Sequence, residues 1–209
     1  MKVSPYKPKE SFLFEVPNEL LKAIAKAVVD GYKEAFDYCQ GNFDKYQLHD
    51  LLPHMRKAAI ERNILHCVKR FPYASAKSAP NQSYNCFHAI VKCGHAILTI
   101  SAVNGPCQMV RNANFRKQYA IDGQFKMFIE EEPAIELNNN LYAILLHTPN
   151  EDFPSEPGFI NIRFPDASLK KYLDEAIDLT QISKKDGQEI IEKPSVVTRW
   201  VAKTGNDAK

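Results

Sequence analysis

The sequence predicts an α+β fold in which N-terminal amphipathic helices pack on a mainly antiparallel sheet, followed by a C-terminal helix and a polar tail. Apolar residues recur at spacings of three and four over the first seventy positions, and from residue 86 they form short runs rich in Val, Ile, Phe and Tyr. Few helical patterns separate these runs, which favours antiparallel pairing. We expect one domain over residues 1–182, with a helical part at 11–71, a loop at 72–85 and a sheet part at 86–182, and then a loosely held tail at 183–209.

Two helices are expected in the helical part. The first spans residues 18–39, where the apolar side chains share one face and Gly41 follows as a stop signal. The second spans residues 53–70, with Pro53 in its first turn, where a missing N–H is tolerated, and with Pro72 beyond its end. The next residues, PYASAKSAPNQSYN at 72–85, lose all periodicity, and this predicts a long loop.

Four strands are expected from runs bounded by turn-forming residues: CFHAIVKC at 86–93, HAILTISAV at 95–103, LYAILLHTP at 141–149 and FINIRFP at 159–165. Residues 92–95 contain a glycine and predict a hairpin between the first two strands. KMFIEE at 126–131 predicts a further strand. A last helix is expected to begin at Asp166 or Ser168 and to continue to Ile177.

Composition indicates an ordinary folded protein, since 44% of the 209 residues are hydrophobic and 25% are charged. No apolar run approaches the roughly 18 residues of a membrane span, and the polar N-terminus lacks the apolar core of a signal peptide. We therefore expect a cytoplasmic protein without membrane contact. Five cysteines without a scaffold-like spacing predict reduced thiols.

The charges are sorted along the chain. Residues 53–126 hold eleven Lys and Arg against two acids, and residues 127–192 hold fourteen acids against five Lys and Arg. The formal net charge of +2 conceals this division. A basic middle and an acidic end can serve an anionic ligand, a partner protein or one another.

The basic segment suggests contact with nucleic acid or another polyanion, because cationic groups neutralise phosphates while amides and aromatic rings contact bases. The competing interpretation is a solvated helix face that pairs with the acidic segment. No helix-turn-helix, RRM, KH or zinc-finger signature accompanies the charges, and no glycine-rich phosphate loop is present, so no cofactor is expected. The candidate nucleic-acid-binding residues are Arg56, Lys57, Arg62, Lys69, Arg70, Arg111, Asn114, Arg116 and Lys117.

Histidines and cysteines offer weak catalytic candidates. The spacing of Cys86, His88, Cys93 and His95 does not match paired zinc knuckles, and strand alternation sends Cys86 and His88 to one face and Cys93 to the other, so no metal site is expected. A hydrolase or nuclease would use His88, Cys93, His95 or His147, as a His/Cys pair or with a carboxylate. Buried thiols and sheet-lining imidazoles are the commoner explanation.

Acidic residues form a second candidate surface. Glu130, Glu131, Glu132 and Glu136 are crowded in a way that suits recognition of a basic protein partner, although plain solubility would explain them as well. The leading hypothesis is therefore a non-enzymatic binding protein with a basic central segment for nucleic acid and an acidic segment for a protein partner. The alternatives are a hydrolase or nuclease, and a structural protein–protein interaction subunit.

Overall fold

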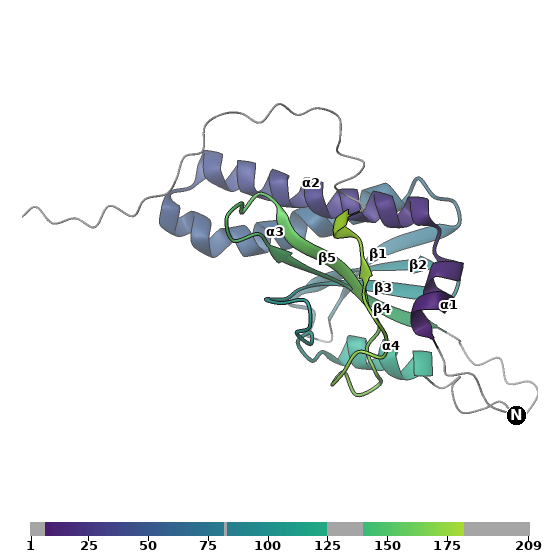
Figure 1. Ribbon diagram of the computed structural model, residues 1–209. Coiled ribbons are helices and arrows are strands. Elements are labelled where there is room, and N and C mark those ends of the chain that lie inside the picture. The colour runs from purple at the N-terminus through teal and green to yellow at the C-terminus, as the bar shows by residue number, and fades with distance from the viewer. Residues whose placement is uncertain (1–6, 82, 125–139, 182–209) are drawn as a thin grey trace, which may run out of the picture.

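The computed structural model describes residues 7–81, 83–124 and 140–181, and it has the α+β architecture expected from the sequence. A six-stranded sheet runs in the order β1-β2-β3-β4-β5-β6, and all neighbouring strands pair antiparallel except β3 and β4, which are parallel. Figure 1 shows three layers, with α2 and α3 on one side of the sheet and α4 on the other. The elements are α1 Pro8–Glu15, α2 Asn18–Asn42, α3 Lys45–Val68, β1 Ala74–Pro80, β2 Phe87–Cys93, β3 Ala96–Ala102, α4 Asn114–Gln124, β4 Leu141–Pro149, β5 Pro157–Arg163 and β6 Ile177–Asp178.

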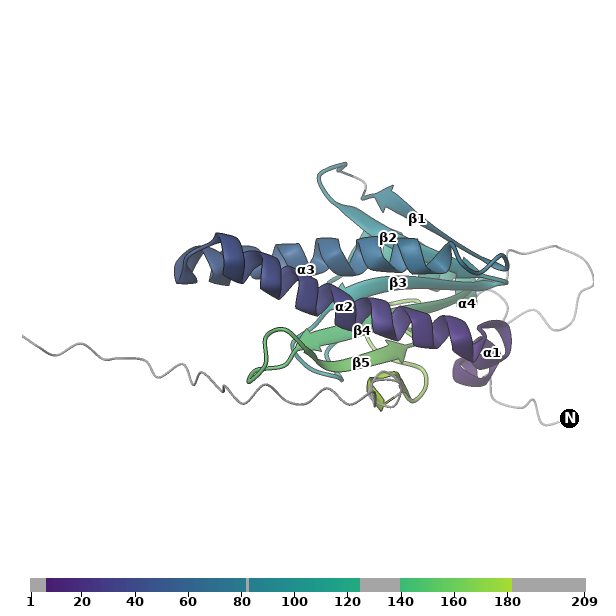
Figure 2. The same cartoon turned by 90° about the horizontal axis from the view of Figure 1, so that it is seen from above.

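Helices α2 and α3 form an antiparallel pair that lies across the sheet (Figure 2). Their close approach depends on Gly31, because a Cβ placed there would meet the Ile60 backbone at 2.8 Å. Helix α3 begins at Lys45, eight residues earlier than expected, so Pro53 lies inside the helix and not in its first turn. The early start is explained by a capping box, in which the Asp44 carboxylate accepts from the backbone of Gln47 and the Gln47 side chain accepts from the backbone of Asp44.

The expected loop at 72–85 was wrong for its first half, because Ala74–Pro80 form the edge strand β1. This strand pairs with β2 along its whole length, from Ala74 opposite Cys93 to Pro80 opposite Phe87. An edge strand of small and polar residues shows no apolar alternation, and the pairing that creates it is long-range.

Strands β2 to β5 confirm the four runs predicted from the sequence, and the expected hairpin joins β2 to β3. Cys93 pairs with Ala96, and Gly94 adopts a positive φ of 53° in the turn between them. The connection from β3 to the parallel strand β4 includes α4. The strand predicted at 126–131 and the tail at 183–209 lie outside the described residues.

The helix expected from Asp166 to Ile177 was also wrong. Asp166 accepts hydrogen bonds from the backbone N–H groups of Lys170 and Lys171, and its own N–H donates to the Lys171 carbonyl. Leu169 has φ 55°, which is incompatible with a right-handed helix. The polar side chain that predicted a helix cap instead closes a compact loop, and the chain then returns to the sheet as β6.

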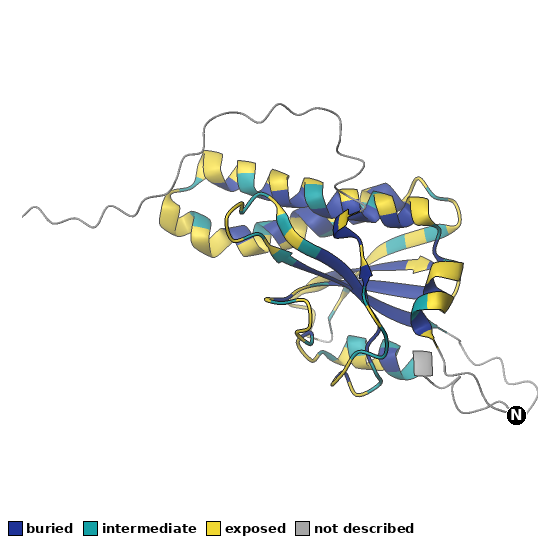
Figure 3. Cartoon of the chain, in the orientation of Figure 1, coloured by how far each residue is buried: buried dark blue, intermediate teal, exposed yellow. Residues whose placement is uncertain are grey.

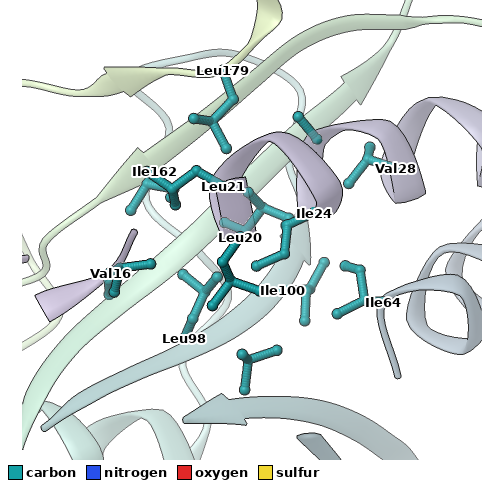
Figure 4. Packing of buried hydrophobic residues seen from close by; sticks show 14 of the residues in the cluster. Val16, Leu20, Leu21, Ile24, Val28, Ile64, Leu98, Ile100, Ile162 and Leu179 are labelled. Carbon is teal, nitrogen blue, oxygen red and sulfur yellow. The ribbon is translucent and has the colours of Figure 1, made fainter. Parts of the chain in front are cut away.

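The main core lies between the helix pair and the sheet. Leu20, Leu21 and Ile24 of α2 pack with Leu98 and Ile100 of β3 (Figure 4). A second cluster lies on the other face, where Ile90, Ile97 and Ile144 pack with Ala120 of α4. Figure 3 shows buried residues concentrated in the strands, whereas the ends of α2 and α3 nearest their connection are mostly exposed. Within the described residues, no helix is long and apolar enough to cross a bilayer.

Candidate functional site

The sheet opens between β2 and β3 at the end away from their hairpin. Pairing between these strands ends at Ile90 and Thr99. Beyond this point, β2 continues to Phe87 beside β1, and β3 continues to Ala102 beside β4. We call the diverging ends, residues 87–89 and 100–102, the β2–β3 fork; Figure 2 shows β1 and β2 turning away from β3 there.

Helix α3 supplies hydrogen-bond partners to the β2 side of the fork. Lys57 Nζ donates to the carbonyl oxygen of Phe87 at 2.6 Å and lies 3.2 Å from Glu61 Oε2. The Glu61 carboxylate accepts from the backbone N–H of Ala89. In the register that ends at Ile90 and Thr99, Ala89 and Ile100 would be the next pair, so Glu61 replaces a backbone partner that β2 has lost.

Arg116 of α4 plays the matching role on the β3 side. Its Nη2 donates to the carbonyl oxygen of Ile100 at 3.5 Å, and its Nη1 donates to the carbonyl oxygen of Arg111 at 2.9 Å. The preceding residue, Phe115, stacks on His88 of β2 with ring centroids 3.7 Å apart and an interplanar angle of 17°. Side chains from both helical layers therefore meet at the fork.

The electrostatics of the fork reflect burial of charge. Burial raises the pKa of Glu61, while Lys57, the Ala89 N–H and Arg116 oppose that shift. Burial also lowers the pKa of His88, and the charges of Arg116 and Lys57 lower it further, so His88 is neutral at neutral pH. The fork thus holds one carboxylate between two cations beside a neutral imidazole.

These side chains supply hydrogen bonds to backbone groups that the separated strands no longer pair, and they do not form a catalytic centre of a known kind. Metal-assisted hydrolysis uses two or more carboxylates converging on one cation, and the fork contributes Glu61 alone. Across residues 7–81, 83–124 and 140–181, no three His, Cys, Asp or Glu side chains gather in a way that could hold a metal ion.

The four weak catalytic candidates are dispersed. Cys93 and His95 lie at the β2–β3 hairpin. The Cys93 thiol is 3.3 Å from the Glu15 carbonyl oxygen, and the backbone N–H of His95 donates to the Glu15 carboxylate. His147 lies six residues along β4 from Leu141, the partner of Ala96, which corresponds to about 20 Å. His88 lies five residues from Cys93 on β2, so their side chains project from opposite faces. No His/Cys pair forms among these four residues.

The basic candidates on α3 and at its end are mostly engaged within the protein. Arg56 is buried; its guanidinium lies 5.2 Å from the ring centroid of Tyr32, and its Nη2 donates to the Pro154 carbonyl oxygen at 2.7 Å. This candidate nucleic-acid-binding residue is therefore buried and not on the solvated face of α3. Arg62 forms an ion pair with Glu34, and Arg70 donates to the Cys67 carbonyl oxygen. Lys69 is exposed in the C-cap position of α3.

A different set of cations is exposed on the α4 side of the sheet. Lys77 of β1 is opposite Ile90, whose side chain packs towards α4, and Lys92 lies two residues from Ile90, so both lysines share that face. Arg111 precedes α4, and Lys117 lies in its first turn after Asn114 and Arg116. No carboxylate of the described residues forms an ion pair with Lys77, Lys92, Arg111 or Lys117, all of which are exposed; we call these four residues the α4-side basic surface.

The acidic partner-binding candidates Glu130, Glu131, Glu132 and Glu136 lie outside the described residues. Glu61 was not predicted from the sequence, although its position four residues after Lys57 is a common signal of an ion pair on a helix. Tyr32 was likewise not predicted as a polar partner inside the core, and the sequence carries no local signal for that role.

Comparisons with known proteins found no match: no family model, no curated protein and no solved structure is similar to this chain at a significant level.

Proposed function

We propose that this chain is a non-enzymatic binding protein for nucleic acid or another polyanion, and that the contact is made by the α4-side basic surface. The observation that carries this proposal is the exposure of Lys77, Lys92, Arg111 and Lys117 on one side of the sheet without an ion-pair partner among the described residues. A cation already paired with a carboxylate gains little from a phosphate, whereas an unpaired exposed cation can neutralise one and release its counterions.

The side of the sheet that α2 and α3 cover, which we call the helix side, has exposed cations that are paired with carboxylates. There Lys26 lies 3.2 Å from Asp30, and Arg62 pairs with Glu34. Arg62 and Arg56 of α3 are thus engaged by Glu34 and by the Pro154 carbonyl oxygen, so the proposal moves the expected contact from α3 to α4. Contact of the acidic segment with a protein partner stays a prediction. The hydrolase or nuclease alternative gains no support, because His88 and Cys93 project from opposite faces of β2 and His147 lies about 20 Å along β4 from the level of the hairpin.

The test is fluorescence anisotropy with labelled DNA and RNA strands over a series of salt concentrations. The variant Lys77→Glu, Lys92→Glu, Arg111→Glu, Lys117→Glu is compared with a control that makes the same change of net charge on the helix side: Lys26→Glu, Lys33→Glu, Arg62→Glu, Lys69→Glu. Circular dichroism establishes that both variants are folded.

The expected result is salt-sensitive binding by the unaltered protein and loss of that binding in the α4-side variant only. Since each phosphate contact adds about 0.7 to 0.9 to the slope of log affinity against log salt, removing four contacts lowers that slope by about 3. The proposal is wrong if no strand binds at low salt. Equal losses in both variants would also contradict it, because they would reflect net charge instead of a particular surface.

A further inference from the structure

We infer that the turn joining β1 to β2 provides an aromatic platform for an unpaired base, so that the ligand of the α4-side basic surface is a single-stranded nucleic acid. This inference rests on the proposed function and narrows it. It depends on Tyr84, an exposed ring that takes no part in the sequence-based candidates.

Tyr84 combines exposure with an unusual backbone conformation. Its side chain is 76% exposed, yet its φ is 55°, in the left-handed region that bulky residues rarely adopt. The ring is not buried in the core, so packing does not compensate for the strained backbone. Strain that persists without a packing benefit is a mark of functional positions, where the surrounding structure holds a side chain in a required place.

Asn81 supplies the restraint that holds this turn. Its Oδ1 accepts from the backbone N–H groups of Asn85 at 3.2 Å and of Cys86 at 3.4 Å, and its Nδ2 donates to Asn85 Oδ1 at 2.8 Å. Its carbonyl oxygen accepts from the Tyr84 N–H at 3.0 Å. Asn81 therefore restrains the backbone of Tyr84, Asn85 and Cys86, and this restraint lowers the conformational entropy that binding at Tyr84 would cost.

Phe87 stands next to this turn on an equally fixed backbone. Its side chain is 53% exposed, and its carbonyl oxygen is held by Lys57 Nζ at 2.6 Å. The next residue, His88, stacks on Phe115 at the start of α4. Because side chains alternate along β2, the Phe87 ring projects from the face of Ala89 and Val91, on the side of α2 and α3, and not from the face of His88. At most about 14 Å of extended chain separates the backbone of Tyr84 from that of His88, so Tyr84 is the exposed ring that can lie near the α4 side.

Charge and ring together indicate the class of ligand. A protein docking site would be expected to present aliphatic side chains around the ring, whereas the residues that neighbour Tyr84 in the turn include Asn81 and Asn85, and the turn leads into β2, which carries Lys92 of the basic surface. Cationic side chains bind the phosphate backbone, and exposed aromatic rings stack on bases regardless of sequence. Only an unpaired base can offer a free face, since a duplex hides the faces of its bases in its own stack.

The experiment measures affinity for three labelled probes of equal length: oligothymidylate, an abasic deoxyribose-phosphate strand and a DNA duplex. The variant is Tyr84→Ala. The controls are Phe87→Ala, on the opposite face of β2, and Tyr46→Ala, because Tyr46 is 83% exposed in the first turn of α3. Tyr84→Trp provides a second measurement, because stacking on a base quenches indole emission. The unaltered protein, whose single tryptophan is Trp200, gives the background emission for that measurement.

The expected result is binding of oligothymidylate at least tenfold more tightly than of the abasic strand. Tyr84→Ala should weaken oligothymidylate binding roughly tenfold or more while abasic binding is unchanged, and Phe87→Ala and Tyr46→Ala should change neither. The additional indole emission of the Tyr84→Trp variant should fall on addition of oligothymidylate and not of the abasic strand.

Two results separate the inference from the proposed function. If the unaltered protein binds abasic and base-bearing strands equally, or prefers the duplex, or if Tyr84→Ala binds oligothymidylate as tightly as the unaltered protein, the stacking platform is refuted while polyanion binding stands. If none of the three probes binds at low salt, the proposed function fails and the inference fails with it.

Discussion

The Tyr32 hydroxyl of α2 lies 2.8 Å from Nδ1 of His147 on β4, inside the core and 115 positions away along the chain. The two rings are perpendicular, with centroids 5.5 Å apart. Arg56 of α3 lies over the Tyr32 ring and reaches the Pro154 carbonyl oxygen between β4 and β5. Three buried polar side chains thus connect the helix pair to the far end of β4.

Replacing Tyr32 by phenylalanine should destabilise the protein by about 1–3 kcal/mol, because the ring remains while the buried His147 Nδ1 loses its partner. Urea unfolding followed by circular dichroism measures the change. Tyr38→Phe is the control, since Tyr38 is 51% exposed on the same helix and should lie within about 0.5 kcal/mol of the unaltered protein. Equal stability of Tyr32→Phe and Tyr38→Phe would contradict the assignment of this hydrogen bond.

Acid should weaken the fold through His147. Burial, with a smaller effect from Arg56, lowers the pKa of His147 from its ordinary 6.5 to about 4. Between these values the unfolded chain binds a proton that the folded chain does not, so stability present above pH 6.5 is lost as the pH falls towards 4. The contribution is up to about 3 kcal/mol.

The measurement is the free energy of unfolding at several pH values between about 7 and 4 for the unaltered protein and for His147→Gln. The decline should be smaller in His147→Gln, so that the difference between the two proteins shrinks as the pH falls. His49→Gln, which removes an exposed histidine, should follow the unaltered protein. Parallel curves for the unaltered protein and His147→Gln would show that His147 does not titrate in this way.

The sequence predicted the elements in which apolar residues recur at a regular spacing that matches their buried faces. Helix α2 and strands β2 to β5 place apolar side chains at regular intervals, because one or both faces of each are covered. β1 was missed because its residues are small and partly exposed, and its existence depends on pairing with β2. For Asp166, the same side-chain chemistry serves a helix cap or a loop, and the φ of Leu169 selects the loop.

The candidate site was predictable only in part. Arg56 lies four residues before Ile60 and eight before Ile64, and this helical spacing places it on the buried side; the sequence therefore held a signal against its exposure. The fork carried no such signal, because Glu61 meets Ala89 and Arg116 meets Ile100 only after the sheet has formed. The charge division was visible, but the assignment of exposed cations to the α4 side required the register of β1 and β2.

Gly31 should tolerate no side chain. A Cβ at this position would lie 2.7 Å from Ile60 Cγ1 and 2.8 Å from the Ile60 backbone, so Gly31→Ala must push α2 and α3 apart. We expect a loss of about 1–3 kcal/mol. Gly41→Ala is the matched control on the same helix, where a Cβ meets nothing within 4 Å, and it should stabilise the protein by up to about 1 kcal/mol. Thermal unfolding of the two variants checks the opposite signs, and a neutral Gly31→Ala would contradict the close approach.

The fork should depend on Glu61 as an acceptor more than on its charge. Glu61→Gln keeps an oxygen for the Ala89 N–H and should cost less than about 1 kcal/mol, whereas Glu61→Leu leaves that N–H unpartnered and should cost about 1–3 kcal/mol. Native-state hydrogen exchange at the Ala89 amide gives a local measurement. Exchange should be much faster in Glu61→Leu and nearly unchanged in Glu61→Gln, and equal protection in all three proteins would place the acceptor elsewhere.

We expect the left-handed backbone conformation of Tyr84 to lower the stability of the protein. Because its φ of 55° is strained for any residue with a Cβ, Tyr84→Gly removes the strain and should stabilise the protein by about 1 kcal/mol, while Tyr84→Ala keeps the strain and should be close to neutral. Urea unfolding of the three proteins measures the order. If glycine is no better than alanine, the turn does not hold Tyr84 under strain. If glycine stabilises the fold, the natural tyrosine is retained at a cost in stability, as expected where a side chain is needed for binding.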